Sequence, residues 1–487
     1  MGVADLDLVP RPTSLRVLAG RYALTPETPL RAPGSIAALV RAVLRPFPPA
    51  GGDGPGLTFT LVDDPELGAE GYRLAVSTGG VQATGSDAGL RWAVQTLRQM
   101  LPPTLDDARW SIPCVEIVDI PRYPWRGSLL DVARWYHRVE FLYRYVDLMA
   151  MHKLNTLHLH LTDDQGWRFE VRRYPRLTEV GGYRRESNRG HARHRRFDGT
   201  PHGGWYSQAQ LRDLVGYAAR RGVRVMPEID VPGHMQAAIA AYPELGNEPG
   251  RQLEVRTSWG ISSHILNVSD ATVRFVKDVL DEVVEVFPFE LVHLGGDEVP
   301  PDEWAGSRVA ARRVRSTGLS RVDDLVGWWA TELATHLAGH GRRVAVWDEV
   351  LEYEPPPGAV IFAWRDESRV VAARKAGFEV VAVPQEYAYL DWAESDRPDE
   401  PLAINGTLPL SRVYGYQPGD VYGVQGQVWT EYLPTPDLVE WRAFPRLVAL
   451  AEVGWSAQRE PFTGFRERLR GHLRRLDALR VHYRPLD

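Results

Sequence analysis

The sequence predicts an α/β protein in which a small α/β domain precedes a (β/α)8 TIM barrel. One observation is a series of eight short apolar runs, separated by amphipathic helical stretches, from residue 127 onward. Another is the length of 487 residues, which exceeds one average domain. A third is the change of pattern near residue 120. We therefore divide the chain into a small domain, residues 1–120, and a barrel domain with a C-terminal helix, residues 121–487.

The first 120 residues have the pattern of a small α/β domain. The runs 56–62 and 71–78 alternate apolar and polar residues, which is typical of half-buried strands. Residues 90–101 repeat their apolar residues at helical spacing. Two prolines, Pro121 and Pro124, mark the junction with the next domain.

The remainder has the pattern of repeated βα units. Short apolar runs that alternate with helices indicate a parallel sheet, and eight of them fit a closed barrel. The expected strands are residues 127–133, 156–162, 224–230, 291–296, 343–347, 359–364, 379–383 and 421–429. The expected helices include residues 139–153, 207–222 and 271–287 and a closing helix within 465–483.

Polar, acidic or aromatic residues follow these strands nearly every time. In a barrel of this type the loops after the strands form the face that carries the chemistry. Glycosidic bond cleavage needs a proton donor and a stabilised oxocarbenium-like transition state. Sixteen tryptophans, several of them at strand ends, would supply walls for the apolar faces of sugars. The sequence therefore favours a carbohydrate-cleaving enzyme.

Composition argues against several other classes of function. The net charge of -6, spread along the chain, leaves no footprint for nucleic acid or an anionic membrane. The single cysteine, Cys114, excludes a disulfide framework and leaves too few thiols for a structural zinc site. No apolar run approaches the roughly 18 residues of a membrane span. The start MGVADLDLVPRP lacks the features of a secretory signal, so we expect a cytoplasmic protein.

Two histidine-containing segments are interpreted as structural or solvent-exposed rather than as binding sites. His158 and His160 lie two apart on an expected strand and therefore face the same way. They could bind a metal, but packing and hydrogen bonding inside the barrel is the favoured interpretation, and we expect no metal or cofactor. The run HARHRR at 191–196 is interpreted as a solvated loop rather than a nucleic-acid site.

Several motifs carry a resemblance to a known family. They are LHLTDDQGWR at 159–168, PEIDVPGH at 227–234 and HLGGDE at 293–298, with WDE at Trp347 and VWTE around Trp429. In this order they resemble the family 20 glycoside hydrolases, the β-N-acetylhexosaminidases. The resemblance covers nearly the whole chain, and residues 1–120 resemble the small non-catalytic domain of that family.

The resemblance implies hydrolysis of terminal N-acetylglucosamine or N-acetylgalactosamine from an oligosaccharide or glycoconjugate. It implies exo action with retention, in which the 2-acetamido group of the substrate attacks the anomeric carbon. By resemblance, Asp297 orients the acetamido group and Glu298 is the general acid. A general acid must keep its proton near neutral pH, so we expect Glu298 to be buried or beside negative charge, which Asp297 supplies.

The remaining roles also follow from the resemblance. Asp163 and His234 form a relay behind Glu298, and Tyr389 hydrogen-bonds the acetamido oxygen. The residues expected to hold the sugar hydroxyls are Arg126, Asp391 and Glu431. The expected aromatic walls are Trp347, Trp364 and Trp429.

Two departures and two alternatives stay open. Trp135 stands where the family commonly has histidine, and the basic loop 185–204 leaves substrate preference beyond the first sugar undecided. The preference between gluco and galacto configuration and the oligomeric state are also open. One alternative is an ordinary retaining glycosidase that uses Glu228 and Glu349. The other is an inactive carbohydrate-binding barrel, against which the intact Asp297 and Glu298 speak.

Overall fold

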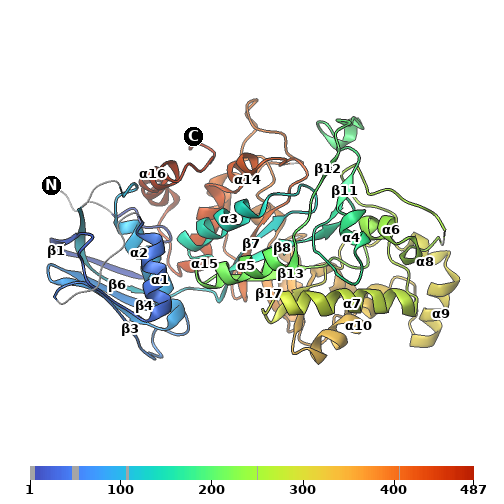
Figure 1. Cartoon of the computed structure of the whole chain (residues 1–487), viewed down its shortest axis with the longest axis horizontal. Helices are drawn as coiled ribbons and strands as arrows, with labels where there is room; N and C mark the ends of the chain where they lie inside the picture. Colours follow the sequence, from blue (N-terminus) through green and yellow to red (C-terminus); the bar gives the residue numbers. More distant parts are fainter. Residues whose placement is uncertain (1–5, 46–53, 106–108, 249, 405) are drawn as a thin grey trace.

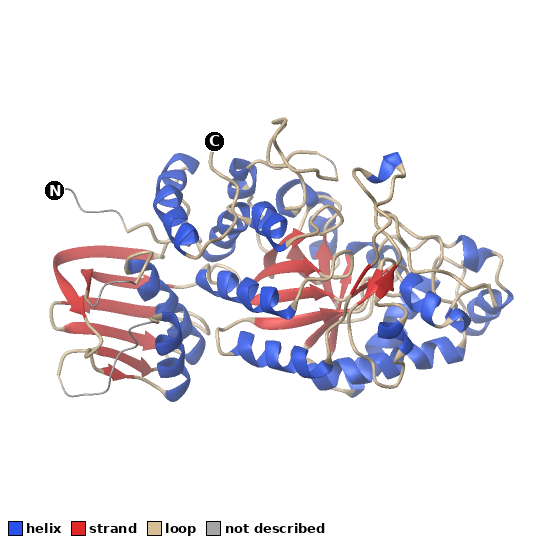
Figure 2. Cartoon of the chain, turned by 45° about the horizontal axis from the view of Figure 1, so that its top comes forward, coloured by secondary structure: helices blue, strands red, loops and turns tan. Residues whose placement is uncertain are grey.

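A six-stranded sheet with two helices on one face forms the N-terminal domain of the computed structural model (Figure 2). The strand order is β1-β6-β4-β5-β3-β2. The strands are β1 (Ser14–Leu24), β2 (Leu30–Arg31), β3 (Leu57–Leu61), β4 (Tyr72–Ser77), β5 (Gly80–Gly85) and β6 (Trp110–Asp119). The helices are α1 (Gly34–Val43) and α2 (Asp87–Met100). Ser86 caps α2 by accepting a hydrogen bond from the Gly89 amide.

The structure describes residues 6–45, 54–105, 109–248, 250–404 and 406–487.

The core of the small domain lies between the sheet and its helices. Leu74 and Val76 of β4 belong to the same buried cluster as Leu90, Val94 and Leu97 of α2. The two strands and the helix expected here are confirmed as β3, β4 and α2.

Eight parallel strands close into a barrel in the order β13-β14-β15-β16-β17-β18-β7-β8. All eight runs expected from the sequence form these strands. Their bounds are β7 (Trp125–Asp131), β8 (Thr156–His160), β13 (Arg224–Glu228), β14 (Leu291–His293), β15 (Arg343–Trp347), β16 (Val360–Ala363), β17 (Glu379–Ala382) and β18 (Gly423–Val428). The barrel prediction is therefore confirmed.

Amphipathic helices surround the barrel (Figure 1). In α7 the buried Val276, Leu280 and Val283 recur at helical spacing and face the strands. The longer helices are α3 (Val139–Met151), α5 (Gln208–Ala219), α7 (Asp270–Val286), α9 (Arg308–Thr317), α10 (Leu325–Gly339), α11 (Glu367–Lys375), α14 (Pro436–Ala443), α15 (Arg446–Trp455) and α16 (Phe462–Ala478). Within the described ranges, none has the length and hydropathy needed to cross a bilayer.

Short elements enlarge the loops at one end of the barrel. The helices are α4 (Arg176–Glu179), α6 (Gln236–Ala241), α8 (Asp302–Ala305), α12 (Gln385–Ala388) and α13 (Leu410–Gly415), with 3-10 turns η1 (Ala192–His194), η2 (Pro243–Leu245) and η3 (Asp348–Tyr353). The strands are β9 (Thr162–Asp163), β10 (Gly166–Trp167), β11 (Tyr183–Arg184) and β12 (His202–Gly203). These loops follow the carboxyl ends of the strands, which is the end expected to carry a site.

The small domain covers the opposite, N-terminal end of the barrel. Lys153, directly before β8, donates to the Asp119 carboxylate at 2.6 Å and to the Tyr72 hydroxyl at 2.9 Å. The Trp455 indole, at the end of α15, donates to the other oxygen of Asp119 at 2.7 Å. A buried charged contact therefore joins the two domains.

Candidate active site

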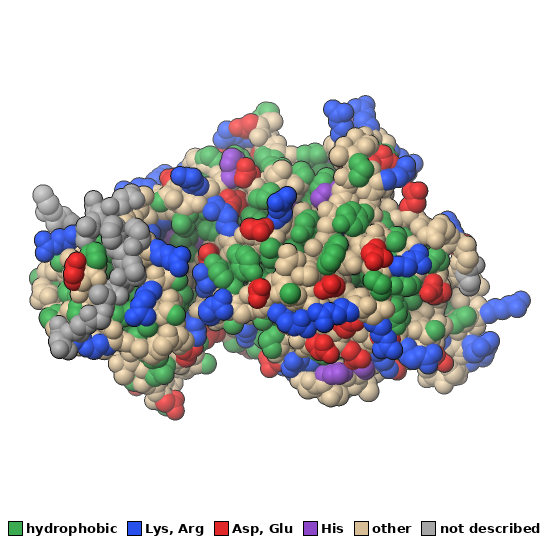
Figure 3. All heavy atoms as spheres, in the orientation of Figure 1, with side chains coloured by type: hydrophobic (Ala, Val, Ile, Leu, Met, Phe, Trp, Pro, Cys, Tyr) green, Lys and Arg blue, Asp and Glu red, His purple; other side chains and the backbone are tan. Residues whose placement is uncertain are grey.

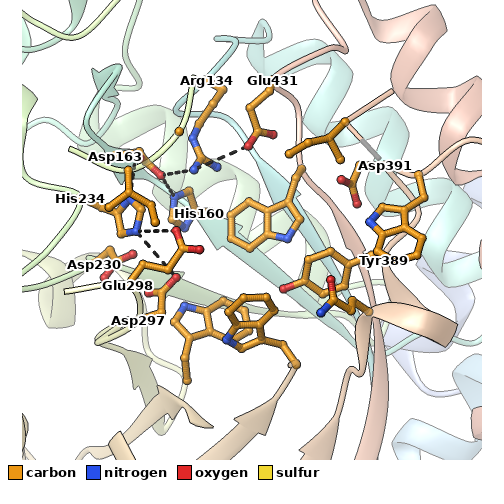
Figure 4. Close-up of a pocket in the computed structure, with 18 residues that line it drawn as sticks. Arg134, His160, Asp163, Asp230, His234, Asp297, Glu298, Tyr389, Asp391 and Glu431 are labelled. Atoms are coloured by element: carbon orange, nitrogen blue, oxygen red, sulfur yellow. Dashed lines mark hydrogen bonds and ion pairs between the residues drawn. The ribbon is translucent and has the colours of Figure 1, made fainter. Parts of the chain in front are cut away.

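A cavity of about 350 Å3 opens at the carboxyl ends of the barrel strands (Figure 4). Every site residue expected from the sequence lines it except Arg126. The predicted residues that line it are Asp163, His234, Asp297, Glu298, Trp347, Trp364, Tyr389, Asp391, Trp429 and Glu431. The folded chain thus brings together residues that span 269 positions of sequence, from 163 to 431.

The backbone after β14 turns tightly to deliver Asp297 and Glu298. Gly295 has φ +67°, and a Cβ there would lie 1.7 Å from an oxygen of Asp230. Only glycine fits at this close approach. Glu298 itself adopts φ +47°, a left-handed conformation that is costly for a residue with a Cβ. This turn aims both carboxylates into the cavity.

The two neighbouring carboxylates differ in exposure. The side chain of Asp297 is 13% exposed and that of Glu298 is 36% exposed. Burial raises the pKa of Asp297 well above its usual range, and the charges of Asp230 and Glu298 add to this effect. Asp297 is therefore more enclosed than the expected general acid, Glu298, which lies at the mouth beside this carboxylate.

His234 contacts both carboxylates through one ring nitrogen. Its Nε2 lies 3.8 Å from Asp297 Oδ2 and 3.6 Å from Glu298 Oε2, while Nδ1 lies 3.2 Å from Asp163 Oδ1. Burial alone would lower the pKa of this imidazole, but the carboxylates of Asp163, Asp230 and Asp297 raise it well above its ordinary value. A cationic His234 would stabilise negative charge on either member of the pair.

Asp163 is held in place from two sides. Its Oδ2 lies 3.0 Å from His160 Nε2 and 2.8 Å from a terminal nitrogen of Arg134. Burial raises the pKa of Asp163, but the positive charges of Arg134 and His234 outweigh it and hold the pKa well below its ordinary value. Asp163 lies next to His234, and His234 lies next to Glu298, in the order expected of the relay; the effect of this relay on the protonation of Glu298 stays a prediction.

A fully buried glutamate, Glu228, lies beneath the cavity at the end of β13. Its Oε1 accepts hydrogen bonds from the Trp347 indole and lies near His293 Nδ1, both at 2.9 Å. Its Oε2 lies 2.5 Å from His160 Nδ1 and 3.1 Å from His158 Nε2. The packing and hydrogen-bonding role expected of His158 and His160 is confirmed. Glu228 connects the aromatic wall to the relay.

Aromatic rings form one side of the cavity. Trp364 stacks on Tyr389 with ring centres 5.8 Å apart, and Trp347 lies 6.0 Å from Trp429. The Trp364 indole donates to Glu349 at 2.9 Å, and the Trp347 indole donates to Glu228. Both indole rings are therefore fixed by carboxylates behind the wall rather than by packing alone.

Arg126 lies outside the cavity, and its assignment as a hydroxyl-binding residue is wrong. It stands near the start of β7, where the barrel faces the small domain. Its guanidinium is fully buried and pairs with Glu70 at 2.5 Å, and it donates to the carbonyls of Tyr123 and Lys153. The start and the end of a barrel strand lie on opposite faces, so a residue at the start cannot reach the cavity.

Arg134 occupies the cavity instead. It follows β7 and donates to Asp131 at 3.1 Å, while its other terminal nitrogen lies 3.9 Å from Glu431 Oε1. Asp391 lies on the same side of the cavity (Figure 4), and burial, with the charge of Glu431, raises its pKa to about 8. Arg134, Glu431 and Asp391 together form a polar end suited to sugar hydroxyls.

Trp135, the departure noted in the sequence, supports this polar end from outside. Its indole donates to the Glu431 backbone carbonyl at 3.1 Å, and its backbone amide donates to the Thr430 hydroxyl at 3.3 Å. The Arg184 guanidinium lies 4.8 Å from the Trp135 ring centre. The tryptophan thus fixes the segment that carries Glu431.

Among the lining residues that sequence reasoning missed, three carry titratable side chains: Arg134, His160 and Asp230. Arg134 and Asp230 come directly after strands, so the rule that found the other residues would also have found them. His160 is the last residue of β8, and its role depends on contacts with Asp163 and Glu228 that lie on other elements or loops.

Comparison with known proteins agrees with this geometry. Residues 123–458 match the glycosyl hydrolase family 20 catalytic domain, and residues 5–120 match domain 2 of the same family. The chain belongs to glycosyl hydrolase family 20. It is a glycoside hydrolase, with the barrel as the catalytic domain of that family.

Individual relatives support the same assignment. A β-hexosaminidase of Porphyromonas gingivalis is 38% identical over 436 residues, which cover 86% of this chain and 55% of the relative. A β-N-acetylhexosaminidase of Cellulomonas fimi is 35% identical, covering 94% of this chain and 91% of that protein. The chain thus spans about half the length of the first relative and nearly all of the second.

A solved structure is also similar. The exo β-N-acetylglucosaminidase of Vibrio harveyi in complex with N-acetylglucosamine has a TM-score of 0.90 and 31% identity, with 99% of this chain and 78% of that chain covered. The similarity to this structure and to the two relatives supports an activity on terminal N-acetylhexosamines, with a substrate that contains a hexosamine.

Proposed function

We propose that the protein is an exo-acting, retaining β-N-acetylhexosaminidase in which the substrate's own 2-acetamido group is the nucleophile. The observation that carries the proposal is the pair Asp297 and Glu298, whose carboxylates share one contact, His234 Nε2. One carboxylate is buried and the other lies at the mouth. The two groups can therefore serve different atoms of one bound sugar.

In the first step Glu298 gives its proton to the leaving glycosidic oxygen. The acetamido oxygen attacks the anomeric carbon as the bond to that oxygen breaks, which forms a cyclic cationic intermediate. Asp297 balances the positive charge at the acetamido nitrogen. Its Oδ1 has no hydrogen-bond partner within the described residues, so a substrate N–H is the donor that it lacks.

In the second step Glu298 takes a proton from water, and that water attacks the anomeric carbon. The bond to the acetamido oxygen breaks, and the acetamido group is restored. Two displacements at one carbon give net retention. The rings of Trp347, Trp364 and Trp429 enclose the side of the cavity where the acetamido methyl would lie.

Exo action is supported by the polar end of the cavity. The side chains of Arg134 and Glu431 are 10% and 12% exposed, so the groups that would hold the far hydroxyls are almost closed off from solvent. A sugar that fills this end has no room for a further residue beyond it. The cavity therefore suits a terminal sugar.

The arrangement disfavours an ordinary retaining glycosidase with two protein carboxylates. Glu228 is fully buried, and both of its oxygens are occupied by the Trp347 indole and by histidines. Glu349 contacts the Trp364 indole and lies outside the set of residues that line the cavity. Neither carboxylate is free to attack the anomeric carbon.

The test compares 4-nitrophenyl β-N-acetylglucosaminide with the matching β-glucoside. Substrate assistance requires cleavage of the first and at least about a thousandfold lower kcat/KM for the second. Proton NMR of the first product should show the β anomer. Equal cleavage of the two glycosides, or an α product, would refute the proposed mechanism.

A further inference from the structure

A strongly basic hairpin stands beside the mouth of the cavity. Residues 189–196 contain Arg189, Arg193, Arg195 and Arg196, and no acidic residue. All four are exposed, and no ion pair involves them among the described residues. Figure 3 shows Lys and Arg side chains gathered at the tip of the protrusion above β11 and β12. The whole chain has a net charge of -6, so this concentration of positive charge is local.

The hairpin has a defined backbone. Asn188 and Phe197 form an antiparallel bridge, and the Arg189 amide donates to the Arg196 carbonyl at 2.8 Å. The carboxylate of Asp198 accepts from the Ser187 amide at 2.9 Å. The arginines are therefore presented on an ordered base, which lowers the entropy lost when they bind a ligand.

Contacts tie the hairpin to both sides of the cavity mouth. On one side, the Asn188 side chain accepts from the Trp259 amide at 2.7 Å, next to Gly260 and Ile261, which line the cavity. On the other side, His191 Nε2 lies 3.1 Å from the carbonyl of Ile404, which also lines the cavity. The hairpin thus bridges the rim outside the terminal-sugar site.

A second hollow, of about 790 Å3, lies under the arginines. Its lining includes Arg189, Arg193 and Arg196 together with Phe197 and Leu402. Phe197 and Leu402 are 39% and 44% exposed, so the hollow combines apolar surface with unpaired positive charge. Leu402 is two residues, or about 7 Å of chain, from the rim.

We propose that this hollow binds anionic groups, carboxylate or sulfate, on the part of a glycan substrate that extends beyond the terminal N-acetylhexosamine. Guanidinium groups match the planar or tetrahedral oxygens of these anions, and exposed apolar side chains match sugar faces. Glu400, two residues before Leu402, pairs with Arg484 and Arg442 rather than with the hairpin arginines. The inference rests on the proposed function for the terminal sugar only.

The test uses a hexasaccharide of alternating N-acetylglucosamine and glucuronic acid with N-acetylglucosamine at its non-reducing end. Its control is the same chain with every carboxylate reduced to an alcohol. The variant is Arg189→Gln, Arg193→Gln and Arg196→Gln combined. The matched control variant combines Arg308→Gln, Arg312→Gln and Arg315→Gln, three exposed arginines on α9.

In the hairpin variant, kcat/KM for the acidic hexasaccharide should fall about tenfold at low salt, mainly through KM, because three unscreened charges are lost. The reduced hexasaccharide and 4-nitrophenyl β-N-acetylglucosaminide should change by less than about twofold. The α9 variant should match the wild type on all three. A sulfated chain of neutral sugars, run in parallel, identifies whether carboxylate or sulfate shows the larger loss.

Equal wild-type rates on the acidic and reduced chains would overturn the proposal. An equal loss of kcat/KM on the acidic and the reduced hexasaccharide in the hairpin variant would also overturn it. Titration of Glu298→Gln with both chains separates this proposal from the proposed function. A carboxylate-dependent Kd supports the anion site even if the 4-nitrophenyl substrate is not cleaved.

Discussion

The two ends of the barrel both bury charged side chains, and they differ in how those side chains are partnered. At the N-terminal end, every nitrogen of the Arg126 guanidinium has an acceptor, and Lys153 has two. At the C-terminal end, within the described residues, His234 Nε2, Asp297 Oδ1 and Asp391 Oδ1 have no hydrogen-bond partner. The first arrangement stabilises the fold, and the second keeps polar atoms for a ligand.

The largest effect that would test this contrast is the replacement Asp297→Asn. Turnover of 4-nitrophenyl β-N-acetylglucosaminide should fall about 10²–10³-fold, because the charge that balances the acetamido nitrogen is lost. The Tm should stay level or rise, since a buried carboxylate with a raised pKa costs stability when it ionises. Kinetics and thermal unfolding measure the two effects. Asp302→Asn, at an exposed position nearby, is the control. A marked fall in Tm for Asp297→Asn would contradict the contrast between the two ends, because it would mean that Asp297 stabilises the fold.

At the N-terminal end of the barrel, Arg126→Met should have the opposite effect: stability should fall while activity is retained. It leaves the partly buried Glu70 carboxylate without its guanidinium partner, so the free energy of unfolding should fall by about 3 kcal/mol. The folded fraction should keep kcat near that of the wild type. Urea unfolding and steady-state kinetics at low temperature test this. Arg73→Met removes a partly exposed ion pair of the small domain and should cost less than about 1 kcal/mol.

Glu228→Gln tests the connection between wall and relay. We expect kcat to fall about 10–100-fold with a small change in KM, as for other groups that orient a reacting residue. The negative charge of Glu228 raises the pKa of His160, so its loss should move the alkaline limb of the kcat profile to lower pH. Glu290→Gln, at an exposed position, is the control. A lower Tm with an unmoved limb would mean that Glu228 only supports packing.

The last prediction concerns the pH dependence of stability at Glu349. Burial, with the charges of Asp297 and Asp348, raises its pKa from 4.5 to about 9. Between these values the folded protein binds this proton and the unfolded chain does not, so stability falls as pH rises, by at most about 1.4 kcal/mol per pH unit. Glu349→Gln should flatten the curve of unfolding free energy between pH 5 and 9. The exposed Glu352→Gln should leave its slope unchanged.

The barrel could be predicted because each buried parallel strand forms a short apolar run, and the closing order then follows from the repeat. Site residues that directly follow a strand could be predicted for the same reason. Arg126 was misassigned because its side chain type suits a hydroxyl site, while its place before the strand puts it at the wrong end. Arg134 follows the same strand, so the rule that site residues come directly after strands would have identified it.

Other features could not be predicted from order along the chain. Which of two adjacent carboxylates is buried depends on a left-handed turn at Glu298 and on packing against Asp230. The contacts of Glu228 join β13 to β8, β14 and β15, and no spacing in the sequence indicates them. The bridging position of the basic hairpin depends on contacts with Trp259 and Ile404, which lie far from it in the chain.

The indole of Trp455, which lies 336 residues further along the chain, donates a hydrogen bond to Asp119. During synthesis the small domain leaves the ribosome before the barrel, so this carboxylate at first lacks its contacts with Lys153 and Trp455. Its contact surface cannot close until almost the whole catalytic domain has been translated. The last turns of the barrel therefore determine when the nascent first domain acquires its final stability, and a chain that stops before residue 455 would leave that surface open to the quality-control machinery of the cell.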